Sequence, residues 1–169
     1  MKSRARLTSI AFALCFAANL LFAQSEKPAV LTADQLKQSV PSTYFFRGQS
    51  ATVQVRNSGG LQVGKDSLVL VALVDTGGYA TDIKQKYQGL FITEVKLNIG
   101  GSSLAPGEYG FGFNADGKFR VMDVAANDLF ATDIKNDDNL KRPVPLKLVE
   151  EGGEYRLYAG KKYVVIKVE

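Results

Sequence analysis

Short runs in which apolar and polar residues alternate follow one another from residue 43 to the end of the chain. Turn-forming clusters such as Gly77-Gly78 and Gly152-Gly153 separate them. Many short strands joined by glycine-rich turns are typical of an all-β fold, and we expect an antiparallel β-sandwich or small barrel. About eight or nine strands are predicted, over residues 43–46, 51–56, 67–74, 90–98, 107–113, 118–124, 145–150, 154–159 and 162–168.

One predicted strand is apolar at every position from Leu68 to Val74. A strand without alternation is covered on both faces, so this segment should lie centrally in its sheet. The cluster Asn57-Ser58-Gly59-Gly60 is predicted to be a turn that separates it from the strand before.

Two or three short helices are expected beside the strands. Thr32 can cap a helix over residues 32–39, with Gln35 as its capping-box partner. Leu31 can pack onto Leu36 across the first turn. This helix lies ahead of the main strands.

The strand 107–113 alternates glycines with three aromatic residues, and its partner over 118–124 alternates too. A register with Asn114 opposite Lys118 puts the apolar side chains of both strands on one face. That register needs a three-residue loop with Gly117 in the left-handed conformation, which the sequence Asn-Ala-Asp-Gly suits. A register shifted by one residue would place basic side chains among the aromatic ones.

The last three strands are predicted to form a meander, with Leu148 opposite Leu157 and Leu157 opposite Val164. Its core face should carry Leu146, Leu148, Tyr155, Leu157, Val164, Ile166 and Val168. The other face should carry Lys147, Arg156, Tyr158, Tyr163, Val165 and Lys167.

A five-residue motif occurs twice: the sequence Ala-Thr-Asp-Ile-Lys stands at 80–84 and again at 131–135. One interpretation is an internal repeat near residues 67–101 and 118–153. The other is that Thr-Asp is a favourable helix start used twice. The first copy begins a second predicted helix, which ends near Gly89.

The N-terminus has the pattern of an export signal. Basic residues at Lys2, Arg4 and Arg6 precede an apolar run that ends at Ala23. We therefore expect residues 1–23 to be a signal peptide, cleaved to leave a periplasmic or extracellular protein without a membrane span. An uncleaved anchor is the alternative, at the short limit for a span.

The rest of the chain divides into an N-terminal segment with the short helix, residues 24–42, and a single β domain, residues 43–169.

Composition excludes several kinds of active site. The chain has no His, and its one cysteine, Cys15, lies in the export segment, so Ser-His-Asp triads, thiol chemistry and the usual zinc sites are excluded. We expect neither a cofactor nor a metal. Without the export segment the chain has 18 basic and 17 acidic residues, and this balance does not indicate a nucleic acid partner.

Asp75-Thr76-Gly77 ends the apolar strand and resembles the active-site motif of aspartic proteases. The resemblance implies that Asp75 shares a proton with a second aspartate and activates water. The second copy of the repeat has Ala126-Asn127-Asp128 instead, so only a homodimer could supply the pair. The alternative is a strand-ending turn in which Asp75 accepts backbone N–H groups.

Two further candidates have structural alternatives. Gly110 and Gly112 could admit a ligand, or they could relieve crowding beneath a neighbouring segment. Three aspartates, Asp133, Asp137 and Asp138, could suggest Ca²⁺, but their spacing does not match an EF-hand loop, and a solvated polar loop is the preferred interpretation.

Tyr158 and Tyr163, with Arg156 beside them, form a candidate surface. They could be an aromatic platform for a glycan or peptide, or a cross-strand pair packed under a loop. The whole pattern predicts an exported, non-catalytic binding or structural β protein with an unknown protein, peptide or glycan partner. An aspartic-protease-like hydrolase that uses Asp75 in a homodimer is the alternative.

Overall fold

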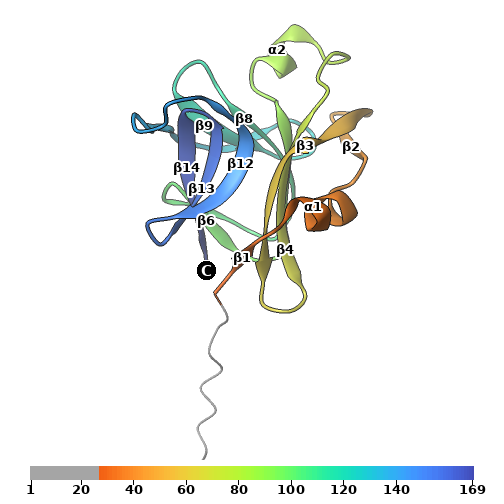
Figure 1. Cartoon of the computed structure of the whole chain (residues 1–169). Helices are drawn as coiled ribbons and strands as arrows, with labels where there is room; N and C mark the ends of the chain where they lie inside the picture. Colours follow the sequence, from red (N-terminus) through yellow and green to blue (C-terminus); the bar gives the residue numbers. More distant parts are fainter. Residues whose placement is uncertain (1–26) are drawn as a thin grey trace, which may run out of the picture.

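The computed structural model describes residues 27–169, so the expected export signal lies outside the described residues. Within this range the chain forms two antiparallel β-sheets and two short helices (Figure 1). The sheets pack against one another as two layers, which confirms the predicted all-β fold in its sandwich form.

The larger sheet has eight strands in the order β1-β3-β4-β5-β8-β9-β10, and β2 pairs with β3 beside this path. Its strands are β1 (Ala29–Val30), β2 (Thr43–Phe46), β3 (Gln49–Val63), β4 (Ser67–Val74), β5 (Gly89–Thr93), β8 (Gly107–Phe113), β9 (Lys118–Met122) and β10 (Asp128–Asp133).

The smaller sheet has six strands in the order β12-β13-β14-β6-β7, and β11 pairs with β14. Its strands are β6 (Leu97–Ile99), β7 (Ser102–Leu104), β11 (Lys135–Asn136), β12 (Val144–Glu151), β13 (Glu154–Gly160) and β14 (Lys162–Val168).

Strand β4 lies between β3 and β5 and is buried on both faces, as its uninterrupted apolar sequence predicts. Val69 and Val71 face the smaller sheet and join the core between the two sheets. Leu70, Ala72 and Val74 face the other way, into a second core under the helices and β2. The larger sheet is therefore the middle of three layers, as Figure 1 shows.

Helix α1 (Ala33–Ser39) covers the outer face of the larger sheet. Its capping box is formed as predicted: Thr32 accepts from the Gln35 N–H, and the Gln35 side chain accepts from the Thr32 N–H at 2.8 Å. Leu31 and Leu36 are both buried in the second core. Helix α2 (Thr81–Lys84) is shorter than the predicted helix to Gly89.

Both predicted hairpin registers are confirmed. Phe113 lies opposite Phe119, and Asn114 donates its N–H to the carbonyl of Lys118. Gly117 has a φ of 79°. In the meander, Leu157 lies between Leu148 and Val164. The predicted core face of the meander lies in the core between the sheets.

The predicted turn at residues 57–60 is wrong, because these residues belong to the 15-residue strand β3. Their glycines serve close packing: a Cβ on Gly59 would lie 2.7 Å from both the Cβ and the backbone nitrogen of Leu148. A Cβ on Gly60 would lie 2.8 Å from Leu31 Cδ1. The two glycines that predict a turn here instead allow neighbouring segments to pack closely against β3.

The predicted strand 90–98 is also wrong in its extent. It divides into β5 and β6, which lie in different sheets on either side of residues 94–96. Four strands were not predicted: β1, β7, β10 and β11. The two copies of the five-residue motif differ in structure, since Thr81 begins a helix whereas Thr132 lies in β10.

Candidate functional site

The predicted surface formed by Arg156, Tyr158 and Tyr163 lies on the outer face of the smaller sheet. Tyr158 and Tyr163 are opposite one another, with ring centroids 5.2 Å apart. The Arg156 guanidinium carbon lies 4.8 Å from the Tyr163 ring centroid. Tyr158 is only 3% exposed. A glycan platform needs an open ring face, and these contacts favour the packed cross-strand pair.

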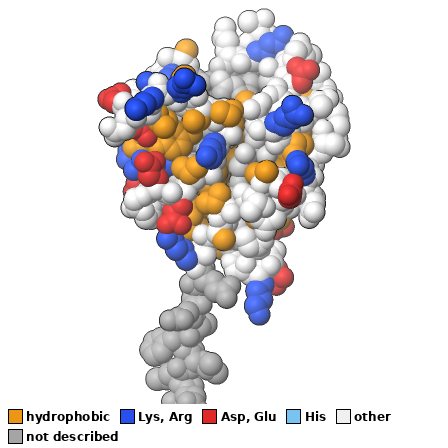
Figure 2. All heavy atoms as spheres, viewed as in Figure 1, with side chains coloured by type: hydrophobic (Ala, Val, Ile, Leu, Met, Phe, Trp, Pro, Cys, Tyr) orange, Lys and Arg blue, Asp and Glu red, His pale blue; other side chains and the backbone are white. Residues whose placement is uncertain are grey.

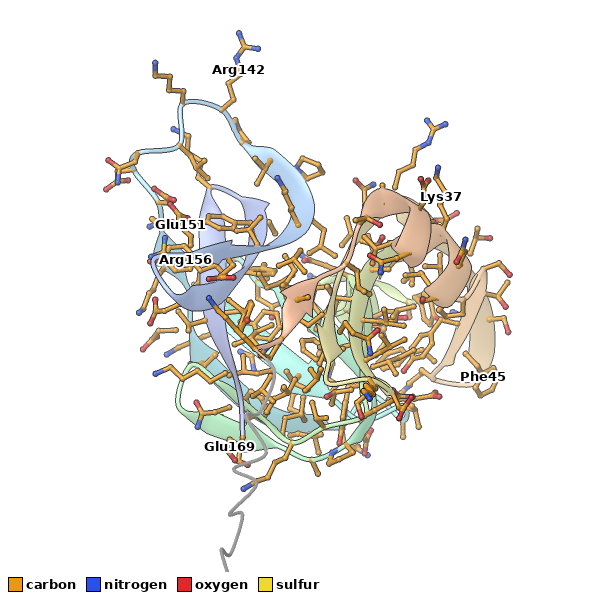
Figure 3. The ribbon with its side chains drawn as sticks, turned by 60° about the horizontal axis from the view of Figure 1, so that its bottom comes forward. Lys37, Phe45, Arg142, Glu151, Arg156 and Glu169 are labelled. Atoms are coloured by element: carbon orange, nitrogen blue, oxygen red, sulfur yellow. The ribbon has the colours of Figure 1, made fainter. Side chains whose placement is uncertain are left out.

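Polar groups of this cluster bind one another. The Tyr158 hydroxyl lies 2.7 Å from Asp137 Oδ2 and 2.9 Å from Glu151 Oε2, so its one proton serves one carboxylate at a time. Arg156 binds Glu151 at 3.0 Å, and both residues are labelled in Figure 3. Burial raises the pKa of Tyr158 to about 12, and the Tyr158 hydroxyl lowers the pKa of Asp137. Through the hydrogen bond between Asp137 and Tyr158, the cluster holds the segment after β11 against the smaller sheet.

Asp75 forms the turn that the structural interpretation predicts. Its Oδ1 accepts the N–H of Gly77 at 2.9 Å, and its own N–H donates to the carbonyl of Thr52. The side chain is exposed at the end of β4. These contacts anchor the chain where it leaves the sheet.

The glycine face of β8 is filled. A Cβ on Gly110 would lie 2.4 Å from the Phe46 ring, and a Cβ on Gly112 would lie 2.1 Å from the Lys86 carbonyl oxygen. Phe46 stacks on Tyr87 with centroids 3.8 Å apart. The glycines therefore relieve crowding, because aromatic rings and backbone occupy the space beside them.

The aspartates between residues 133 and 138 do not converge. Asp133 forms an ion pair with Lys118 at 2.6 Å, whereas Asp137 accepts a hydrogen bond from the Tyr158 hydroxyl. In residues 27–169, no group of three or more acidic side chains could hold a metal ion.

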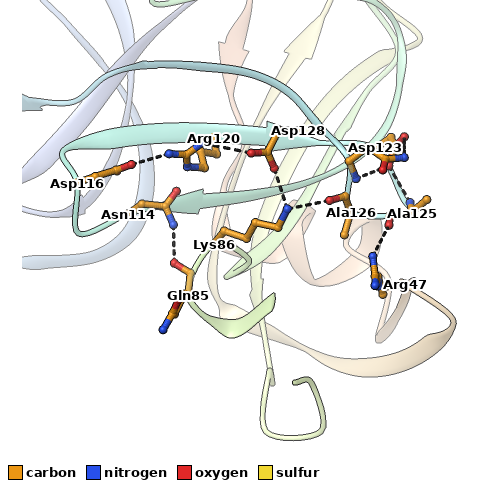
Figure 4. Close-up of polar contacts among 11 residues, drawn as sticks. Arg47, Gln85, Lys86, Asn114, Asp116, Arg120, Asp123, Ala125, Ala126 and Asp128 are labelled. Carbon is orange, nitrogen blue, oxygen red and sulfur yellow. Dashed lines mark hydrogen bonds and ion pairs between the residues drawn. The ribbon is translucent and has the colours of Figure 1, made fainter. Parts of the chain in front are cut away.

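A polar network lies beside an open recess of about 680 Å³ near α2 (Figure 4). Asp128 accepts from Lys86 at 2.9 Å and from Arg120 at 3.2 Å, and Arg120 also pairs with Asp116 at 2.5 Å. Lys86 further donates to the carbonyl of Ala126. These charges are paired with one another, and the network joins the segment after α2 to β9 and β10.

A different hollow has the features of a binding site. It is a groove of about 380 Å³ between α1 and β12, and strand β3 lies along its floor. We call it the α1 groove; it is lined by Val30, Leu31, Ala33, Leu36, Lys37, Val55, Arg56, Ser58, Gly59, Lys147 and Leu148. Figure 2 shows hydrophobic side chains gathered on the face that carries β12 and β1, with basic side chains among them and acidic ones beside them.

The groove follows from the local structure of β3. The pairing of β3 with β4 shifts register between Gln54 and Ser58, and such a bulge bends a strand and redirects its side chains. The Ser58 hydroxyl donates to the carbonyl of Val55 at 2.6 Å and stabilises the bend. Gly59 then lets Leu148 of β12 approach, so the groove lies where the two sheets meet.

The groove has an apolar floor and a basic rim. Leu31, Leu36 and Leu148 are buried at its base. The rim carries Lys37, Arg56 and Lys147, and no acidic residue belongs to the lining. The sequence alone does not predict this site, because its walls come from three segments that are far apart in the chain, residues 30–37, 55–59 and 147–148. Lys147 was placed correctly on the outward face of β12.

The chain matches no family model, no curated protein and no solved structure. Between residues 27 and 169, no helix is long and apolar enough to cross a membrane.

Proposed function

We propose that the protein is an exported, non-catalytic binding protein that holds the apolar part of a ligand in the α1 groove. The observation that carries this proposal is the groove itself. Its apolar lining is open to solvent and includes residues of both cores, Leu148 of the core between the sheets and Leu31 and Leu36 of the second core. Concave apolar surfaces with a few polar groups at the edge are typical of ligand sites. Export is supported by the basic start and the apolar run that ends at Ala23.

Binding of the uncharged dye Nile red tests the groove. Ala33 is exposed on the α1 wall, so Ala33→Trp fills the groove without changing the core. Gln38→Trp is the matched control, since Gln38 is exposed on the same helix and does not line the groove. We expect dye binding by the wild type and by Gln38→Trp, and its loss in Ala33→Trp. Equal binding by all three proteins would contradict the proposal.

The expected export has its own test. N-terminal sequencing of the mature protein should begin at or near Gln24, and a cytoplasmic protein that retains Met1 would contradict it.

The hydrolase alternative is also testable. Pepstatin-sensitive peptide cleavage at acid pH that Asp75→Asn abolishes would favour it.

A further inference from the structure

We infer that the ligand of the α1 groove is an anionic single-chain amphiphile, an alkyl chain that ends in a carboxylate. This inference rests on the proposed function and names its ligand class.

Charge complementarity is the first support. Lys37, Arg56 and Lys147 all line the groove, and no aspartate or glutamate does. Lys37 pairs with Asp34 at 3.0 Å. In the described part of the chain, neither Arg56 nor Lys147 takes part in an ion pair or a side-chain hydrogen bond. Two cations beside an apolar floor favour a ligand with one negative end.

The scarcity of polar side chains in the lining is the second support. Apart from the cations, Ser58 has the only polar side chain of the lining, and its hydroxyl already donates to the carbonyl of Val55. A bound peptide would bring backbone N–H and C=O groups that need partners. An alkyl chain needs no hydrogen-bond partner, so it fits a floor whose side chains are apolar.

The size of the groove is the third support. Its volume of about 380 Å³ lies near the lower end of the range for small-molecule sites. A single chain with a compact head group fits such a volume.

The test compares three probes that share a ten-carbon chain, decanoate, decanol and decyltrimethylammonium, at neutral pH. The two ionic probes are used below their micelle concentrations and decanol below its solubility limit. Each displaces Nile red from the wild type and from the double variant Arg56→Gln/Lys147→Gln. We expect the wild type to bind decanoate about tenfold more tightly than decanol at low salt, because two surface cations contribute modestly each. Added salt should reduce this preference. The double variant should lose it while its binding of decanol is unchanged.

A matched control replaces two cations away from the groove, Lys65→Gln and Lys161→Gln, and should keep the preference for decanoate. Equal affinity for decanoate and decanol, or tighter binding of the cationic probe, would overturn the inference and leave the proposed function standing. Failure of all three probes, together with failure of Nile red, would contradict both. A preference that survives in Arg56→Gln/Lys147→Gln would overturn the assignment of these two residues.

Discussion

Gln88 continues strand β5 with its side chain. Its Nε2 donates to the carbonyl of Phe113 at 3.0 Å, and its Oε1 accepts the N–H of Phe113 at 3.0 Å. Its own N–H donates to the carbonyl of Phe111. The amide therefore repeats the hydrogen-bond pattern of a neighbouring strand beyond Gly89, where β5 begins.

Replacement of Gln88 by Met, which is similar in length and has no amide, should lower the free energy of unfolding by about 1–3 kcal/mol. The reason is that the variant leaves the N–H and C=O of the buried Phe113 without partners. Urea denaturation measures the change. Gln38→Met on the exposed side of α1 is the control and should change stability by less than about 0.5 kcal/mol.

At the scale of single elements, the capping box of α1 connects sequence to the groove. Helix α1 has seven residues, too few to be stable alone, so its ends and its packing decide whether it forms. Thr32 and Gln35 satisfy the first free N–H groups of the helix reciprocally.

We expect Thr32→Ala to lower the free energy of unfolding by about 1 kcal/mol, and Gln35→Ala by less. The double variant should lose less than the sum of the two, because each residue depends on the other for its hydrogen bond. A double-mutant cycle by chemical denaturation measures this coupling. Full additivity would contradict a working capping box.

Local pattern predicted the elements whose rules act over a few residues. The hairpin around Gly117, the meander around Leu157 and the capped start of α1 follow from turn chemistry and alternation. The turn assigned to residues 57–60 failed because the sequence cannot distinguish a glycine that bends the chain from one that admits Leu148.

The same limit explains the other errors. Residues 90–98 are predicted to form one strand, and nothing local shows that the chain changes sheets between Thr93 and Leu97. The motif at 80–84 forms a helix and its copy at 131–135 begins in β10, because tertiary context overrides a five-residue propensity. The α1 groove depends on the same long-range placement, so only its individual residues could be named from the sequence.

At the scale of the whole molecule, both outer layers pack on the larger sheet through apolar cores, and the smaller sheet also has a polar cluster on its outer side. The smaller sheet is joined to the larger one by an apolar core and is closed on its outer side by the polar cluster around Tyr158. The helical layer is held by a second apolar core. Acid should therefore weaken the outer side of the smaller sheet through its carboxylates.

Asp137 is the carboxylate to test. The Tyr158 hydroxyl lowers its pKa in the folded protein below the unfolded value of 3.8. Its contribution to stability is therefore present above pH 4 and is lost as the pH falls through the folded pKa. Asp137→Asn should make the free energy of unfolding less dependent on pH between about pH 5 and about pH 2. Asp138→Asn is the control: Asp138 is exposed, and its replacement leaves the hydrogen bond between Tyr158 and Asp137 in place. Urea denaturation of this variant should show the pH dependence of the wild type.

The core between the sheets should contribute strongly to stability through close packing. Leu157 of β13 is fully buried there, and its cross-strand partners Leu148 and Val164 are buried beside it. Leu157→Ala removes apolar contacts from both partners and leaves a cavity, so it should lower the free energy of unfolding by about 2–5 kcal/mol. Leu129 provides the matched control, since it is 49% exposed on β10 and Leu129→Ala makes the same chemical change near solvent. We expect that control to lose about 1 kcal/mol or less. Urea denaturation of both variants would contradict the packing of the two sheets if Leu157→Ala lost no more than Leu129→Ala.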